Sequence, residues 1–197
     1  MFDDLNRSME LLLRSELSAD LGSQISISFS TPDESFPPTG LTLPAINLFL
    51  FEIRENPQLR EVEATIERRA DGAMMRVPPL VRVDCHYLVT AVAEPSLGSE
   101  QDELRILGAA MKVLLRHRVL PVAVLRGCLV GTSPPVRAAA IRDGAHPSGV
   151  ELWQAIKGKP RPCLHYTLTV PVDVAVAEPI AAPVTALDVR DSSGGGD

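Results

Sequence analysis

The chain has 197 residues and a formal net charge of −6. Hydrophobic residues make up 45% and charged residues 22%, which is ordinary globular usage and argues against wholesale disorder, a collagen-like repeat and a disulfide scaffold. The negative balance argues against a general nucleic-acid surface, because the neutralisation of phosphates needs a clustered positive excess. We therefore expect a soluble protein that does not bind nucleic acid.

The cysteines and the amino terminus predict the compartment. Cys85, Cys128 and Cys163 have no metal-finger spacing and leave one cysteine unpaired, which suits free thiols in a reducing environment. The chain starts with acidic residues and lacks the basic start and apolar run of a secretory signal. No apolar stretch approaches the roughly 20 residues that cross a bilayer. Synthesis and assembly in the cytoplasm, without a membrane segment, are predicted.

The first quarter of the chain predicts a helix and two strands. Residues 25–29 alternate between apolar residues and serine, which indicates a half-buried strand, and a proline-rich surface loop follows at residues 31–44. In residues 45–54, apolar side chains occur at both odd and even positions, which point to opposite faces of a strand. A central strand buried on both faces is therefore expected there. A helix near residues 3–21 precedes them, because five apolar residues recur at helical spacing: Leu5, Met9, Leu12, Leu13 and Leu17.

The middle of the chain predicts a hairpin and a long strand. Residues 59–77 are charged and contain Asp71 and Gly72, a dipeptide that favours tight hairpin turns. Residues 81–89 then alternate between apolar and polar side chains, which predicts a strand with one buried face.

The second half predicts two more helices and the closing strands. Ser99 and Asp102 form a capping-box pattern before a helix with an apolar stripe, and basic residues close that helix. Strands are expected at residues 119–125, 138–141 and 164–172. Ser148 and Glu151 form a second capping box, which begins a short helix before the last strand. The stripe of the longer helix is predicted to comprise Leu104, Leu107, Met111 and Leu114.

These elements predict an α/β (α+β) fold, with a mixed, largely antiparallel sheet flanked by two to three helices. We expect a single domain over residues 1–177. Residues 178–197 are rich in Ala, Pro and Gly, and they are predicted to form a flexible carboxy-terminal tail, because such a segment cannot bury enough surface to become ordered.

Catalytic motifs with strict spacing are absent: the chain has no nucleophile elbow, no His-Glu-x-x-His and no Rossmann glycine fingerprint. We therefore expect no catalysis and no cofactor. One possible zinc set needs the strands of residues 81–89 and 164–172 to be adjacent and in register. A chance placement of these side chains on polar sheet faces is the favoured alternative. The set comprises Asp84, His86, Cys163 and His165.

Several residues are candidates for contacts with protein partners. Between Leu104 and Arg142 there is no Asp or Glu but there are several basic residues, so this segment could attract an acidic partner or simply be solvated. Trp153 fits either an interface anchor or a residue that packs its helix onto the sheet, and the second interpretation is favoured. The charged hairpin fits either a solvated excursion or a contact surface whose edge accepts a partner's strand. The candidate contacts are Arg60, Arg68, Arg69, Arg76, Arg116, Arg118 and Trp153.

Ordered sequence blocks resemble the amino-terminal domain of the cap proteins of extracellular contractile injection systems, such as those of the antifeeding prophage and its virulence-cassette relatives. Residues 46–56 (INLFLFEIREN) are followed by Leu-Arg at 59–60, then Pro-Pro-Leu at 78–80 and DCHYLVT at 84–90. Three further blocks complete the series: LGAAM at 107–111, within an expected helix, LWQA at 152–155 and Arg-Pro at 161–162. Cys85 departs from it, because an apolar residue is expected at that position.

This resemblance implies a tail terminator that forms a homohexameric ring on the distal end of the inner tube and sheath, ends polymerisation and fixes particle length. It implies no catalytic residues. The particle could be released or stay in the cytoplasm. The alternatives are another structural part of the same particle, such as a baseplate adaptor or tube initiator, and a metal-binding enzyme.

Overall fold

The computed structural model describes residues 1–21, 25–60, 63–95, 99–140, 149–174 and 178–179. Contacts divide the chain into two compact units. Residues 1–60 and 81–172 form the first unit, and residues 61–80 and 173–197 form the second. None of the described helices is long and apolar enough to cross a membrane.

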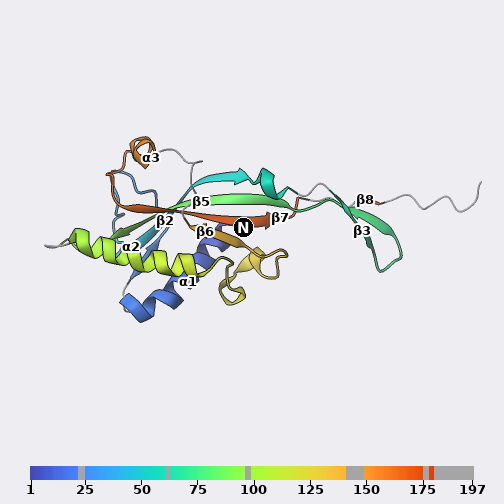
Figure 1. The fold of residues 1–197 in the computed structure, drawn as a ribbon, viewed down its shortest axis with the longest axis horizontal. Coiled ribbons are helices and arrows are strands. Elements are labelled where there is room, and N and C mark those ends of the chain that lie inside the picture. Colours follow the sequence, from blue (N-terminus) through green and yellow to red (C-terminus); the bar gives the residue numbers. More distant parts are fainter. Residues whose placement is uncertain (22–24, 61–62, 96–98, 141–148, 175–177, 180–197) are drawn as a thin grey trace, which may run out of the picture. The chain divides into compact units, whose positions relative to one another are not determined.

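A five-stranded sheet forms the centre of the first unit, with the order β1-β2-β5-β7-β6. β1 runs parallel to β2, and the other neighbours are antiparallel. Figure 1 shows α1 and α2 on one side of this sheet and α3 on the other. The mixed, largely antiparallel sheet with three helices confirms the predicted fold class. The strands are β1 Ser26–Ser28, β2 Ala45–Glu55, β5 Val81–Val92, β6 Arg137–Ala140 and β7 Cys163–Val172, and the helices are α1 Phe2–Leu21, α2 Ser99–Arg116 and α3 Gly149–Ala155.

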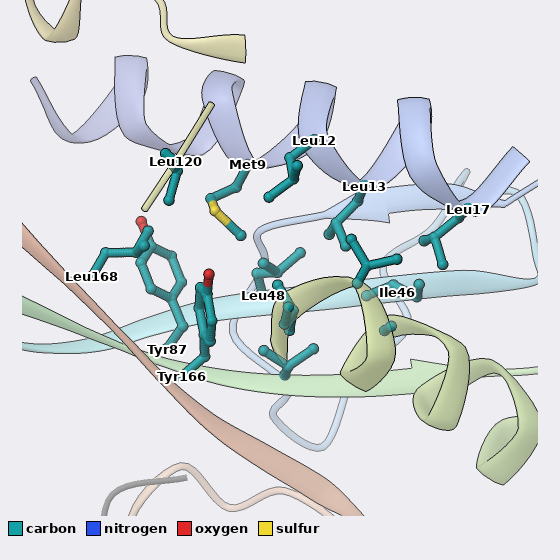
Figure 2. Close-up of a cluster of buried hydrophobic side chains, with 14 of the residues drawn as sticks. Met9, Leu12, Leu13, Leu17, Ile46, Leu48, Tyr87, Leu120, Tyr166 and Leu168 are labelled. Carbon is teal, nitrogen blue, oxygen red and sulfur yellow. The ribbon is translucent and has the colours of Figure 1, made fainter. Parts of the chain in front are cut away.

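The main core lies between α1, α2 and one face of the sheet. Figure 2 shows the apolar side of α1 above side chains from β2, β5 and β7. Each fully buried aliphatic side chain of this kind contributes about 1.5–3 kcal/mol relative to exposure. All five apolar residues that predict the first helix are buried, which confirms that prediction. The largest fully buried side chains include Tyr87, Tyr166, Leu5, Met9, Leu12, Leu13, Ile46 and Leu48.

The opposite face of the sheet is partly covered by α3. Leu152 and Trp153 form a second, smaller apolar cluster with Leu88 of β5. The prediction that β5 buries only one face is therefore wrong, since every residue from Asp84 to Val92 is buried. The reason is that β5 is the middle strand, with Leu88 under α3 and with Asp84 and His86 engaged in hydrogen bonds.

The strand predicted at residues 119–125 is wrong. The segment contains two 3-10 turns, η2 (Val122–Val124) and η3 (Gly127–Leu129), and a single bridge between Val119 and Arg137. Pro121 has no backbone N–H to donate to a ladder. The Ser8 hydroxyl of α1 accepts a hydrogen bond from the Arg126 backbone N–H at 3.0 Å, so the segment is tied to a helix. The strand predicted from residue 138 is confirmed as β6, although residue 141 lies outside the described residues.

The predicted hairpin is confirmed in the second unit. β3 (Thr65–Arg68) pairs antiparallel with β4 (Met74–Val77), and Gly72 in the turn has a φ of +88°, where a side chain would be strained. The Asp71 carboxylate accepts a hydrogen bond from the Ala73 N–H at 3.0 Å. β8 (Glu178–Pro179) pairs with β4, so two residues of the predicted tail adjoin the hairpin. The rest of that tail lies outside the described residues, as does Ser148 of the second capping box.

Candidate interaction surfaces

One face of the hairpin combines apolar and basic side chains. Ile66 lies opposite Arg76, and Arg68 lies opposite Met74, so the alternation of the strands places all four on the same face. Ile66 is 61% exposed and Met74 is 40% exposed. Neither arginine forms an ion pair with a residue in the described part of the chain. We name these four residues the hairpin surface, and Arg69 lies in the adjacent turn, 3.9 Å from Asp71.

The other candidate arginines occupy different places in the first unit. The guanidinium of Arg60 lies 3.6 Å from the Glu55 carboxylate at the surface. Arg116, at the end of α2, pairs with Glu16 of α1, and this contact joins the two helices. The Arg118 side chain is exposed, while its carbonyl accepts the Ala138 N–H at 2.9 Å. The structure thus brings only Arg68 and Arg76 onto one common face.

Trp153 is packed against the sheet with 4% of its surface exposed. Its ring adjoins Gly158, where an added Cβ would lie 2.9 Å from Trp153 Cε3 and 2.3 Å from the Pro32 carbonyl oxygen. Glycine is therefore required for the chain to leave α3 at this point. In this arrangement Trp153 holds α3 onto Leu88, and it reaches a partner only if α3 leaves the sheet.

The polar side of β5 carries a buried hydrogen-bond network. Asp84 accepts a hydrogen bond from Asn56 Nδ2 at 2.9 Å and another from Thr169 Oγ1 at 2.6 Å. Asn56 Oδ1 also accepts from the N–H groups of Gln58 and Leu59, both at 3.1 Å, and so caps η1 (Pro57–Leu59). The network holds together the end of β2 and the η1 turn that follows it.

The strand register does not support the possible zinc set. β5 and β7 are adjacent, but Asp84 lies opposite Thr169, and His86 lies opposite Thr167 with a hydrogen bond of 2.9 Å. Cys163 and His165 pair further along β5, with Thr90 and Leu88. Among the described residues, no three His, Cys, Asp or Glu side chains are grouped to hold a metal. The premise of the metal-enzyme alternative is therefore contradicted by the register.

The three thiols are expected to react at different rates with an alkylating reagent near pH 8. Cys128 is exposed, Cys163 is half-buried, and Cys85 is fully buried. Burial raises the pKa of the Cys85 thiol to about 12, and burial also raises the pKa of Cys163. Because the thiolate is the nucleophile, Cys128 should be labelled first and Cys85 only on unfolding. Mass spectrometry of labelled peptides over time would measure this order.

Equal labelling of Cys85 and Cys128 in the folded protein would contradict this packing.

The raised pKa of Cys85 also makes the stability of the fold depend on pH. The neutral Cys85 thiol supports folding below the unfolded pKa, and this contribution is lost as the pH rises from about 9 toward 12. A Cys85→Ala variant should lose less stability over that alkaline range than the unmodified chain.

Sequence reasoning missed one exposed feature of α2. The residues buried from this helix are Ile106, Leu107, Ala110, Val113 and Leu114, so Leu107 and Leu114 of the predicted stripe are confirmed in the core. Leu104 is instead 54% exposed, and Leu115, which was not in that stripe, is 48% exposed. The signal lay in the sequence, because Leu104, Met111 and Leu115 recur at spacings of seven and four residues.

The described elements define an α/β fold, with a five-stranded sheet and three helices in the first unit and an exposed hairpin in the second. The chain belongs to the Pvc16 N-terminal domain family, whose model matches residues 4–186. This confirms the family resemblance of the ordered sequence blocks. No curated protein sequence matches the chain.

Two solved structures have a similar fold. One is the sheath/tube terminator of PVC, an extracellular contractile injection system, in the extended state, with a TM-score of 0.67 and 24% identity over 99% of this chain. The other is the tube-terminating cap of the anti-feeding prophage, with a TM-score of 0.63 and 24% identity over 97% of this chain. The chain spans 64% and 62% of the lengths of those two proteins.

Proposed function

We propose that this chain is a tail terminator of a contractile injection system, which binds the distal end of the tube and sheath and ends their polymerisation. The observation that carries this proposal is the family membership over residues 4–186, together with the likeness of nearly the whole chain to two terminating caps. The role requires protein contacts and no catalysis. Any activity housed in the remaining length of those caps lies outside the proposal.

The physical logic is that of a growing stack of rings. Each added layer presents a surface that the next layer matches, so growth ends when a different protein matches one side and offers no continuation on the other. We propose that this chain does so as a homohexameric ring, with tube and sheath proteins as partners. The ring would assemble in the cytoplasm on particles that are released or retained. Residues 1–177 would form the terminator domain.

The hairpin supports a specific mode of contact with the sheath. β3 is an edge strand of its three-stranded sheet, and all four of its residues are exposed. An exposed edge presents unpaired backbone N–H and C=O groups to a partner's strand. The proposed contact combines strand addition at β3 with the arginines of the hairpin surface and with Arg69. Arg60, Arg116 and Arg118 remain proposed contacts of the first unit.

Deletion of the gene tests this function through the lengths of the particles. Because nothing then ends polymerisation, we expect sheaths and tubes of widely varying length in negative-stain images, and the wild-type gene should restore a narrow distribution. An Arg68→Ala/Arg76→Ala variant should restore it poorly. The matched control is Arg7→Ala/Arg14→Ala, whose arginines are similarly exposed on α1 but pair with Asp3 and Glu10.

A narrow length distribution in the deletion strain would contradict the proposal. Loss of the baseplate with normal distal ends would indicate an adaptor or initiator at the other end of the particle. Turnover of a small molecule by the purified protein would contradict the non-catalytic role.

A further inference from the structure

An apolar stripe runs along the outer side of α2. Leu104, Gly108, Met111 and Leu115 recur at intervals of four, three and four residues, which places them in one line on a helix. Leu104 is 54% exposed, Leu115 is 48% exposed and Met111 is half-buried. An added Cβ at Gly108 would meet no atom within 4 Å, so the centre of the line is open. We name these four residues the α2 stripe.

The core does not account for the α2 stripe. α2 already packs onto α1 and the sheet through a separate set of buried residues, which includes Ile106, Ala110 and Val113. Single exposed apolar side chains are common on protein surfaces. Two exposed leucines in line with a half-buried methionine and an open glycine have instead the spacing of a helix-packing seam. Gly108 also allows the backbone of a second helix to approach closely.

Basic side chains flank the α2 stripe. Arg105 and Lys112 each follow a residue of the stripe by one position, and both are exposed. Lys112 forms no ion pair with any described residue. Arg105 lies 3.7 Å from Asp102, but such an exposed pair contributes little. The acidic residues of α2 are Glu100, Asp102 and Glu103, and all three precede Leu104. No Asp or Glu occurs from Arg105 to Arg142, so the part of the α2 stripe from Gly108 to Leu115 has no acidic neighbour along the helix.

The geometry points to a partner of defined chemistry: we propose that the α2 stripe binds an amphipathic helix of another protein whose apolar face is flanked by Asp or Glu. Acidic flanks would pair with Arg105 and Lys112, while apolar residues cover Leu104 and Leu115 and one side chain enters the space at Gly108. A second copy of α2 fits less well. An antiparallel pair of α2 helices would place Arg105 of one copy beside Lys112 of the other, and like charges there repel.

Two synthetic helical peptides test the proposal on the full chain. Both consist of three heptads with leucine at the packing positions, and they differ only in carrying Glu or Lys at the flanking positions. Fluorescence anisotropy should detect binding of the Glu peptide and not of the Lys peptide. Leu104→Ser/Leu115→Ser should weaken binding of the Glu peptide more than about tenfold, because it removes both exposed leucines that the apolar face of the peptide would cover. Arg105→Glu/Lys112→Glu should transfer the preference to the Lys peptide.

Gly108→Gln is a second variant, which distinguishes loss of the binding surface from loss of the fold. It fills open space at a half-buried helix position and raises helix propensity, so circular dichroism should show an intact fold while peptide binding is lost. Val122→Ser is the matched control, since Val122 is 77% exposed and lies outside α2. It should leave binding unchanged.

Three outcomes would overturn the proposal. The Glu peptide could fail to bind, or it could bind equally to the unmodified chain and to Gly108→Gln. Sedimentation could instead reveal self-association that Gly108→Gln abolishes, and the occupant would then be a second copy. The inference stands on α2 alone, so particle length in the deletion strain and peptide binding can fail independently.

Discussion

Replacement of Leu48 with alanine is expected to lower the free energy of unfolding by about 2–5 kcal/mol, because the removed atoms leave a cavity in a densely packed core. Leu48 is fully buried on β2. Figure 2 shows it between the strands and α1, and it belongs to the same apolar cluster as Leu12 and Leu13. The loss therefore weakens the contact between the first helix and the sheet. Urea denaturation followed by circular dichroism would measure it.

Ile53→Ala is the matched control on the same strand. Ile53 is 45% exposed, so its truncation should change the free energy of unfolding by less than about 0.5 kcal/mol. Equal losses in the two variants would contradict the placement of the core between α1 and this face of the sheet.

Replacement of Asp84 with alanine is expected to cost about 2–4 kcal/mol of stability, through hydrogen bonds instead of packing. Asp84 is 7% exposed and accepts hydrogen bonds from Asn56 and Thr169. Its removal leaves the buried Asn56 amide and the half-buried Thr169 hydroxyl without this acceptor, and each such loss costs about 1–3 kcal/mol. Because Asn56 also caps η1, the loss should extend to the end of β2. Hydrogen exchange of the Gln58 and Leu59 amides should become faster in the variant.

Asp84→Asn provides the matched control for this network. Asparagine keeps the shape and one acceptor oxygen, so it should lose less stability than alanine. A double-mutant cycle with Asn56→Ala should give a coupling energy of about 0.5–3 kcal/mol, as for residues in one hydrogen-bond network. Additive effects of the two substitutions would show that Asn56 and Asp84 act independently, which would contradict the network.

The elements with strong local patterns could be predicted from the sequence. The 3.6-residue spacing from Leu5 to Leu17 predicts α1, because that spacing places one apolar stripe on a helix. The turn at Asp71 and Gly72 predicts the hairpin, since glycine adopts the left-handed conformation found at that position. In both cases the deciding interactions lie within a few residues along the chain.

The errors occurred where distant contacts decide the structure. Residues 119–125 have strand-like composition, but Pro121 and the hydrogen bond from Arg126 to Ser8 turn the segment toward α1. β5 is buried on both faces because α3, about sixty residues later, covers Leu88. The register of β5 against β7, which separates the possible zinc ligands, likewise depends on pairing over about eighty residues.

The candidate contacts stay predictions, and the structure shows only where their side chains lie. Charge and exposure favoured arginines, and Arg68 and Arg76 do share a face with two exposed apolar residues. Arg116 is instead engaged with Glu16, a contact between helices that no local pattern predicts. The spacing of the α2 stripe can be read from the sequence. Its exposure could be recognised only from the structure, which shows which side of the helix faces the core.

The most direct test of the terminator role is electron microscopy of assembled particles that carry this chain with a gold-binding tag. The account predicts label at the end of the sheath and tube opposite the baseplate, on particles of uniform length. Label at the baseplate, or spread along the sheath, would contradict it.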